Sequence, residues 1–145
     1  MLLSQGADTE AKDPAGLTPL LVAVGRGQVD VVRLLLQHKA STESVDTETR
    51  TALLIGAGMG NTRLVAALLD HSAEKEAKDE KSRTPLLVAS DRRDHDTMEL
   101  LLNAGADVNA EGGIYGNAMR AALYCGDEKT EDVLRKYLGQ TGDIQ

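Results

Sequence analysis

Apolar residues recur along the chain in short segments whose spacing predicts helices. Three of these segments align without a gap at steps of 33 residues, and a fourth keeps the period: GLTPLLVAVGRG (16–27), TRTALLIGAGMG (49–60), SRTPLLVASDRR (82–93) and YGNAMRAALYCG (115–126). Each is followed by a second segment with apolar residues at helical spacing, such as Val29, Val32 and Leu36 after the first. Self-similarity at a fixed period indicates an array of helix pairs, each burying its apolar faces against its neighbours.

The residues at the ends of the first helix in each unit support this prediction. The position before the helix holds a good N-cap residue in every unit: Thr18, Thr51, Thr84 and Asn117. Pro19 and Pro85 occupy the first helical position, where no amide hydrogen bond is lost. Three units have glycine after the helix, where a left-handed residue ends it at little cost: Gly27, Gly60 and Gly126. Arg93 fills this position in the third unit, so we expect local strain or an altered turn there.

The segment TALLIGAGMG (51–60) admits a second interpretation, because an apolar strand that runs into glycines can begin a dinucleotide-binding loop. That fingerprint would also require glycine at position 61, where the chain has Asn61. Gly56 instead aligns with Ala23 and Ala89, inside the first helix of other units, where small residues let helices approach closely. The alignment therefore favours a helix.

The period of 33 residues, with Thr-Pro-Leu at a helix start, resembles the ankyrin repeat. The resemblance covers essentially the whole chain and implies an all-α solenoid of stacked antiparallel helix pairs joined by hairpin loops. It also implies a single domain, residues 1–145, with a partial repeat, three full repeats and a C-terminal capping repeat: 1–12, 13–45, 46–78, 79–111 and 112–145. The last unit resembles the ankyrin arrays that are frequent in fungal proteins.

The chain departs from the family at one recurrent position. The histidine that usually follows Thr-Pro-Leu is replaced in every unit, by Leu21, Leu54, Leu87 and Arg120. In the family this histidine joins neighbouring loops by hydrogen bonds. We therefore expect the rigidity between units to depend more on apolar packing here.

The C-terminal unit has the pattern of a cap. Two second-helix positions that hold Val32 and Leu36 in the first unit hold Glu131 and Arg135 in the last. One helical stripe has thus become polar, as a terminal capping unit requires.

The N-terminal end has the opposite character. Leu2 and Leu3 supply only the last turn of a second helix, so the first full unit should lack part of its partner layer. We expect Leu20 and Val24 to present an apolar face to water. Such a face would associate with another chain or be covered by further repeats upstream.

Composition narrows the classes of function. The net charge of −7 disfavours nucleic acid and anionic membrane surfaces as partners, and no apolar run reaches transmembrane length. The single cysteine, Cys125, allows no internal disulfide, which favours a reducing compartment such as the cytoplasm or nucleus.

The histidines and the cysteine do not form a catalytic or metal-binding pattern. His38 and His71 occupy equivalent positions in successive units, and stacked helices lie about 10 Å apart, too far for two imidazoles to share a metal. His95 has no third ligand in its sequence neighbourhood, and we interpret all three histidines as solvated helix-end residues. Acidic residues follow Cys125 and oppose the thiolate that a nucleophile needs. We expect no enzyme activity, no metal and no cofactor.

The resemblance implies that ligands dock on a concave face formed by the hairpin tips and the ends of the first helices. In this chain the predicted partner-binding residues on that face, including an apolar cluster near its C-terminal end, are Leu17, Arg26, Arg50, Met59, Arg83, Arg92, Ile114, Tyr115 and Tyr124. Arginine binds carboxylates in bidentate fashion and stacks on aromatic groups. Alternatively, Arg50 pairs locally with Glu48 and Arg83 with Glu80, with little energetic consequence.

The sequence thus predicts a scaffold that binds another protein or a peptide segment, in particular an acidic or acidic–aromatic one. A second hypothesis is a structural or sensing segment of a larger multidomain protein, with no independent activity.

Overall fold

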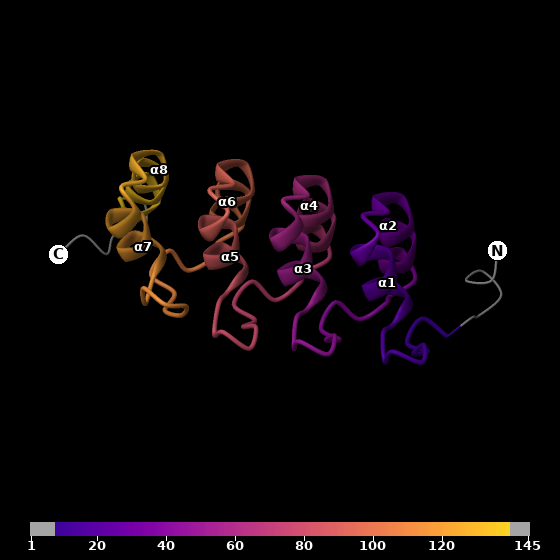
Figure 1. The fold of residues 1–145 in the computed structure, drawn as a ribbon. Helices are drawn as coiled ribbons and strands as arrows, with labels where there is room; N and C mark the ends of the chain where they lie inside the picture. Colours follow the sequence, from indigo (N-terminus) through magenta and orange to yellow (C-terminus); the bar gives the residue numbers. More distant parts are fainter. Residues whose placement is uncertain (1–7, 140–145) are drawn as a thin grey trace.

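The structure, a computed structural model, describes residues 8–139 as four antiparallel helix pairs stacked in sequence order (Figure 1). The pairs are α1 (Pro19–Gly25) with α2 (Val29–Gln37), α3 (Ala52–Met59) with α4 (Thr62–Asp70), α5 (Pro85–Asp91) with α6 (His95–Asn103), and α7 (Ala118–Cys125) with α8 (Glu128–Leu138). A hairpin loop precedes each pair, and we call a hairpin with its helix pair a unit, numbered 1 to 4. The all-α class and the helical solenoid predicted from the sequence are confirmed.

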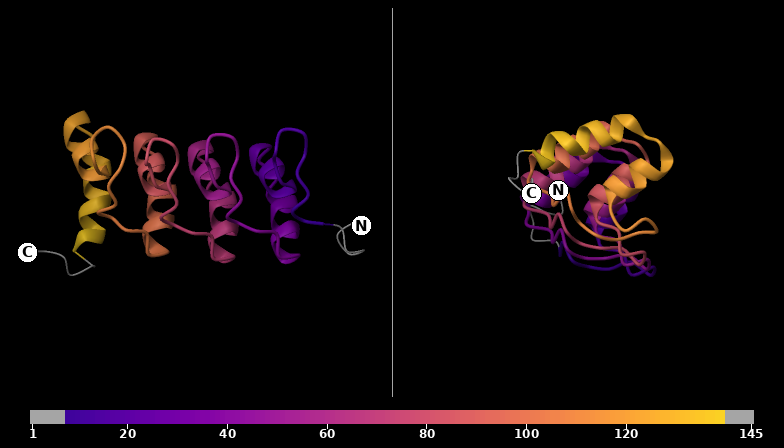
Figure 2. Two further views of the ribbon diagram at one scale, coloured as in Figure 1. Left: turned by 90° about the horizontal axis from the view of Figure 1, so that it is seen from below. Right: turned by 90° about the vertical axis from the view of Figure 1, so that its left-hand side faces the viewer.

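The four units repeat one geometry, so that in an end-on view they lie behind one another with their hairpin loops along one side (Figure 2). The N-caps explain why each first helix begins at the same position. The Thr18 hydroxyl accepts a hydrogen bond from the Leu21 amide at 3.3 Å, and equivalent side-chain bonds start α3, α5 and α7. The predicted caps are therefore confirmed.

Left-handed residues end the first helices, as the sequence predicts. Gly27, Gly60 and Gly126 have φ values of 68°, 67° and 65°. Arg93, in the same position of unit 3, has a φ of 56°, so a residue with a side chain is held in a conformation that costs about 1–3 kcal/mol. Of the two expectations for Arg93, the altered turn is wrong, because the hydrogen bonds of this turn are those of the other units, and the left-handed conformation of a residue with a side chain agrees with local strain.

The segment TALLIGAGMG forms α3, which excludes a strand leading into a phosphate-binding loop. Gly56 lies where α3 crosses α4. A Cβ atom at this position would come within 2.9 Å of Leu64 Cδ2 and 3.3 Å of Val65 Cγ2. The absence of a side chain at Gly56 therefore allows the two helices of unit 2 to approach closely.

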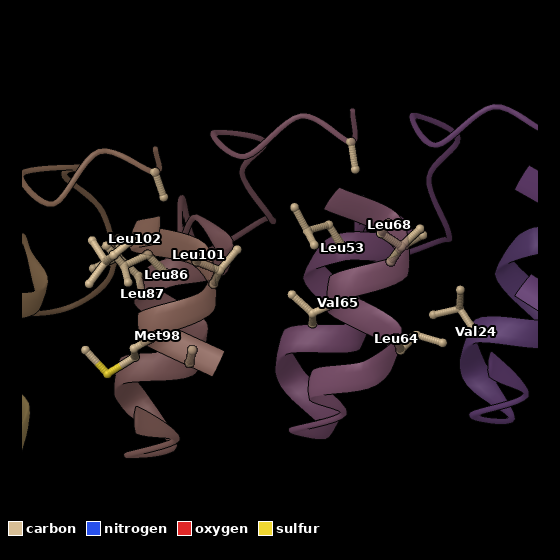
Figure 3. Close-up of a cluster of buried hydrophobic side chains, with 14 of the residues drawn as sticks. Val24, Leu53, Leu64, Val65, Leu68, Leu86, Leu87, Met98, Leu101 and Leu102 are labelled. Carbon is tan, nitrogen blue, oxygen red and sulfur yellow. The ribbon is translucent and has the colours of Figure 1, made fainter. Parts of the chain in front are cut away.

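A continuous apolar core runs through all four units and is built mainly from leucine, valine and alanine. Figure 3 shows part of it in units 1 to 3. Val32, Val65 and Met98 occupy the same position in successive second helices and are fully buried. In α8 the equivalent residue is Glu131, which accepts a hydrogen bond from Arg135 at 3.2 Å. The polar stripe predicted for the last unit is thus present.

The expectation of an exposed apolar face on unit 1 is wrong. Leu20 is 1% exposed and Val24 is 0% exposed. Both belong to the continuous core, because α1 packs against α2 and α3. Leu2 and Leu3, on which the expectation was based, lie outside the described residues.

Polar bonds also join neighbouring units. The carboxylates of three glutamates accept hydrogen bonds from backbone amides 31 residues further on, in the pairs Glu10–Ser41, Glu43–Glu74 and Glu76–Asp107, at 3.0, 3.2 and 3.0 Å. We call these bonds the glutamate rungs. They supplement the apolar packing, and the sequence signal for them is the recurrence of glutamate at 33-residue spacing.

Candidate partner-binding groove

A cavity of about 560 Å³ lies between units 3 and 4 and opens to the solvent; we call it the unit 3–4 cavity. Its lining comes from both hairpins, from α5 and α7 and from the turns that follow these helices. The lining residues discussed below are Lys81, Arg83, Ser90, Asp91, Arg93, Ile114, Tyr115, Ala121, Ala122, Cys125, Asp127 and Thr130.

Two aromatic residues and an isoleucine form an exposed cluster at this cavity. The ring centroids of Tyr115 and Tyr124 are 4.9 Å apart, while Ile114 is 94% exposed and Tyr124 is 77% exposed. Partial desolvation is the main cause that raises the pKa of the Tyr115 phenol, and the nearby Cys125 thiol and Tyr124 raise it further. The predicted apolar cluster therefore assembles at the surface, next to the exposed thiol of Cys125.

Two side chains that differ from their counterparts line the cavity at the boundary between units 3 and 4. At the preceding boundary, Leu54, Ala57 and Val88 pack into a closed apolar cluster. One repeat later, the positions of Ala57 and Val88 hold Ser90 and Ala121, and both line the cavity. Ser90 is more polar than Ala57, and Ala121 has two methyl groups fewer than Val88, which leaves part of this space unfilled.

A hydrogen-bonded network forms one wall of the cavity. Thr130 donates from its hydroxyl to Asp127 Oδ2 at 2.6 Å, and His95 Nε2 lies 3.0 Å from the same hydroxyl. The Thr130 hydrogen bond, together with the charge of Arg93, lowers the pKa of Asp127. Arg93 Nε is 3.5 Å from Asp127 Oδ2.

The interpretation of His95 as a solvated helix-end residue is wrong, because Thr130 of the next unit lies within hydrogen-bonding distance of its ring. His38 and His71 are exposed as expected.

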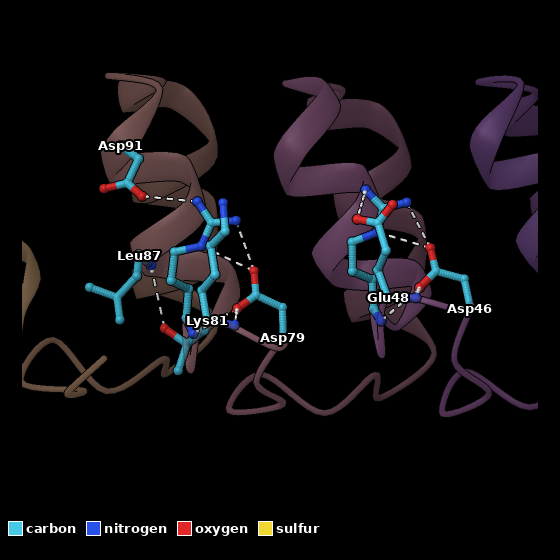
Figure 4. A network of polar contacts seen from close by, with 9 residues as sticks. Asp46, Glu48, Asp79, Lys81, Leu87 and Asp91 are labelled. Carbon is cyan, nitrogen blue, oxygen red and sulfur yellow. Dashed lines mark hydrogen bonds and ion pairs between the residues drawn. The ribbon is translucent and has the colours of Figure 1, made fainter. Parts of the chain in front are cut away.

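Two of the predicted binding arginines form ion pairs within their own units (Figure 4). Arg50 pairs with Asp46 at 2.7 Å and less closely with Glu48 at 3.6 Å. Arg83 pairs with Asp79 at 2.8 Å and with Asp91 at 3.1 Å. The local pair of Arg50 with Glu48 is confirmed, whereas the pairing of Arg83 with Glu80 is wrong: the side chain turns to Asp79, which its own hairpin brings closer.

These aspartates also organise the hairpin backbone. Asp79 accepts hydrogen bonds from the amides of Lys81 and Arg83, both at 2.9 Å, and Asp46 makes the equivalent bonds in unit 2. Burial by itself raises the pKa of each carboxyl, but the hydrogen bonds from the arginine and the amides outweigh it and lower the pKa.

The comparison with known families identifies the repeat. A family model described as ankyrin repeats, in three copies, matches residues 1–79 and 43–112. The chain belongs to the ankyrin repeat family. A search of curated proteins found no match. Ankyrin repeats generally mediate interactions between proteins, and the family is typically a non-enzymatic scaffold.

Of the remaining predicted binding residues, Met59 and Arg92 occupy equivalent positions in successive units of the ankyrin array. Met59 and Arg92, at the ends of successive first helices, each reach over the left-handed glycine of the preceding unit. A Cβ atom on Gly27 would lie 3.6 Å from Met59 Cε, and one on Gly60 would lie 3.2 Å from Arg92 Nη2. Arg26 and Arg92 are exposed, and neither forms an ion pair with another residue in 8–139.

Leu17 differs from the other predicted binding residues of the ankyrin array, because it is half-buried and packs against the core. No cluster of three or more potential metal ligands occurs among the described residues. Within the same part of the chain, every helix is too short or too polar to cross a membrane.

Proposed function

We propose that this ankyrin array is a scaffold that binds a segment of another protein in its concave groove, and that it prefers an acidic–aromatic segment. The observation that carries the proposal is the exposure of large apolar side chains, Ile114, Tyr115 and Tyr124, beside the groove. Clusters of this kind mark interaction sites on soluble proteins, and tyrosine is enriched among the residues that dominate binding energy.

The structure changes which arginines should recognise an acidic segment. Arg50 and Arg83 already hold aspartates of their own hairpins, so their charges are largely neutralised. Arg26 and Arg92 are exposed and have no carboxylate partner within residues 8–139. We therefore assign the acidic preference to Arg26 and Arg92, with Met59, 40% exposed, providing apolar contact between them.

The test uses peptides of 12 residues selected from a displayed random library on the wild-type protein. The selected peptides should be enriched in aromatic and acidic residues, and calorimetry should show at least tenfold weaker binding to Arg26→Glu/Arg92→Glu and to Tyr124→Ala. The matched control is Arg33→Glu/Arg63→Glu, which makes the same charge change on exposed positions of the second helices.

Melting temperatures of all variants should remain close to the wild type, because none of these side chains is buried. Equal affinity of the wild type, the groove variants and the control would overturn the proposal. A library that yields no binding peptide would do so too, and would favour a purely structural segment of a larger protein.

A further inference from the structure

Five departures from the repeat pattern of this chain meet at the unit 3–4 cavity. Ala121 and Ser90 are smaller or more polar than their counterparts Val88 and Ala57. The other three replace small residues: Arg93 stands where other units have glycine, Tyr115 where they have Gly16, Thr49 and Ser82, and Tyr124 where they have Gly25, Gly58 and Asp91. Of the five, all but Tyr124 line the cavity, and Tyr124 packs on Tyr115.

The convergence argues against a simple packing defect. A defect would leave the surrounding residues as they are in the other units. Here the rim gains two aromatic rings and a cation, while the side chain at position 121 is smaller than in the other units. The cavity volume of about 560 Å³ lies within the range of about 300–1,000 Å³ that is typical of ligand sites.

The hairpin of unit 4 is built differently from the other three, and this places Tyr115 at the cavity. In units 1 to 3 the amide of the residue aligned with Tyr115 donates to the carbonyl three residues earlier, as Ser82 does to Asp79 at 2.9 Å. In unit 4, Gly113 instead donates to the carbonyl of Lys81 in the neighbouring hairpin at 3.3 Å, and the left-handed conformation moves to Gly113 and Gly116. Tyr115 is thereby released from the tight turn and lies over Cys125 and Tyr124.

The chemistry of the walls defines the occupant. Ala121, Ala122 and the ring of Tyr115 offer apolar contact, which suits an aromatic side chain because rings pack favourably edge-to-face or offset. Three cations and two carboxylates line the same space, and Arg83 already pairs with Asp79 and Asp91. Lys81 forms no ion pair with any residue in 8–139, so a carboxylate next to the aromatic ring would find a free partner.

We infer that the unit 3–4 cavity is a socket for one aromatic side chain of the bound protein segment, with an adjacent carboxylate of that segment on Lys81. The inference rests on the proposed function and adds to it the position and the chemistry of the anchoring residue. Arg93 contributes a second cation at the rim, 3.5 Å from Asp127.

The first experiment fills the socket. Ala121→Ile introduces the residue that unit 2 carries at Ile55, and the matched control Val22→Ile makes the same type of change at the aligned position of unit 1. The selected peptides should bind Ala121→Ile at least tenfold more weakly and bind Val22→Ile as they bind the wild type. The cavity can also be filled without a mutation. Iodoacetamide should alkylate the single, exposed Cys125 in the folded protein, and the added group should weaken binding to a similar extent.

The second experiment uses 3-phenylpropionate as a probe, with 3-phenylpropanamide as its uncharged analogue, in an NMR titration of the labelled protein. The acid should shift the amides of Gly113, Ala122 and Cys125 and bind several-fold more tightly than the amide. In Lys81→Gln the two compounds should bind equally, whereas Lys12→Gln, a control in the first hairpin region, should retain the difference.

The outcomes separate the two proposals. Peptides that bind Ala121→Ile and the alkylated protein as tightly as the wild type would overturn the socket and leave the groove function in place. Probe shifts at the cavity without any selectable peptide would overturn the groove function, and with it the assignment of the socket to a protein segment.

Discussion

The two boundaries on either side of unit 3 differ at equivalent positions: one is closed by apolar packing and the other contains a cavity. Between units 2 and 3, Leu54, Ala57 and Val88 close an apolar cluster, and between units 3 and 4 the positions aligned with Ala57 and Val88 line a cavity of about 560 Å³. The helices of units 3 and 4 repeat the arrangement of units 2 and 3, so two differences distinguish the boundaries: the smaller side chain of Ala121 and the changed hairpin of unit 4. An ankyrin array can therefore open a cavity through a small number of local changes, at a local cost in packing.

The hairpins show a parallel difference. Asp13, Asp46 and Asp79 hold the hairpins of units 1 to 3 through bonds to their own backbone amides. Unit 4 has Gly112 in this position, and its hairpin is held instead by close packing on unit 3. Three hairpins are thus organised by a charge, and the fourth by the absence of a side chain.

The largest expected effect follows from that close packing. In Gly112→Ala the new Cβ atom would lie 1.7 Å from the backbone oxygen of Ser82, so the hairpin of unit 4 must move away from unit 3. We expect the free energy of unfolding, measured by urea denaturation, to fall by about 3 kcal/mol. Gly25→Ala is the control, because no atom lies within 4 Å of its Cβ position, and it should not destabilise the protein.

The next effect tests the difference between the boundaries directly. Val88→Ala removes two buried methyl groups from the closed boundary and should lower the free energy of unfolding by about 2 kcal/mol. Ala121→Val makes the reverse change at the open boundary and should alter it by less than about 0.5 kcal/mol. Equal destabilisation by both substitutions in urea denaturation would show that the cavity is not the counterpart of the closed cluster.

A smaller effect concerns the charged hairpins. The pKa of Asp46 and of Asp79 is lower in the folded than in the unfolded state, so their stabilisation is complete above about pH 4 and is lost as the pH falls through the folded-state pKa. At pH 7, Asp79→Asn should cost about 1.5 kcal/mol, because hydrogen bonds to a charged group are replaced by weaker ones.

Hydrogen exchange gives the matching control for this prediction. In acid, or in Asp79→Asn, the amide of Arg83 should lose protection, since it donates to the Asp79 carboxylate. The amide of Gly112 donates to the Gly116 carbonyl and should be protected as before. Loss of protection at both amides would mean that the two hairpin types are not independent.

The smallest effect concerns a contact between units 3 and 4 outside the cavity. The Tyr137 hydroxyl donates to Asn103 Oδ1 at 2.7 Å. Because Asn103 is exposed and water can replace the hydroxyl, Tyr137→Phe should lower the free energy of unfolding, measured by thermal denaturation, by only about 0.5 kcal/mol. Peptide affinity should be unchanged, since neither residue lines the cavity; a loss of affinity would show that the whole boundary, and not the cavity, controls binding.

The sequence predicts those features that a single unit determines locally. The N-cap bond of Thr18 and the left-handed Gly27 depend on residues within one or two turns of each helix, and the alignment of units predicts them directly. The 33-residue period then predicts the stacking, because a helix pair of this size has no other way to bury both apolar faces.

The features that the sequence did not predict depend on how neighbouring units meet. The partner of His95 is Thr130, 35 residues away, and Leu20 is buried by helices of its own and the next unit. The smaller volume of Ala121 compared with Val88 contributes to the unit 3–4 cavity only because α5 and α7 lie side by side. The sequence signal for this cavity is the presence of Tyr115 and Tyr124 at two positions where the other units have smaller residues.

The cavity also bears on how the protein folds. Substantial contacts between helices join partners in one unit or in adjacent units, so folding can start within any neighbouring pair and spread along the chain. The unit 3–4 boundary contains the cavity, so we expect this propagation to be weakest there, with unit 4 the last to join and the first to leave. A segment bound across the cavity would connect units 3 and 4. At a concentration one hundred times its dissociation constant it would stabilise the array by about 2.7 kcal/mol. The partner would thus act as the missing part of the folded core.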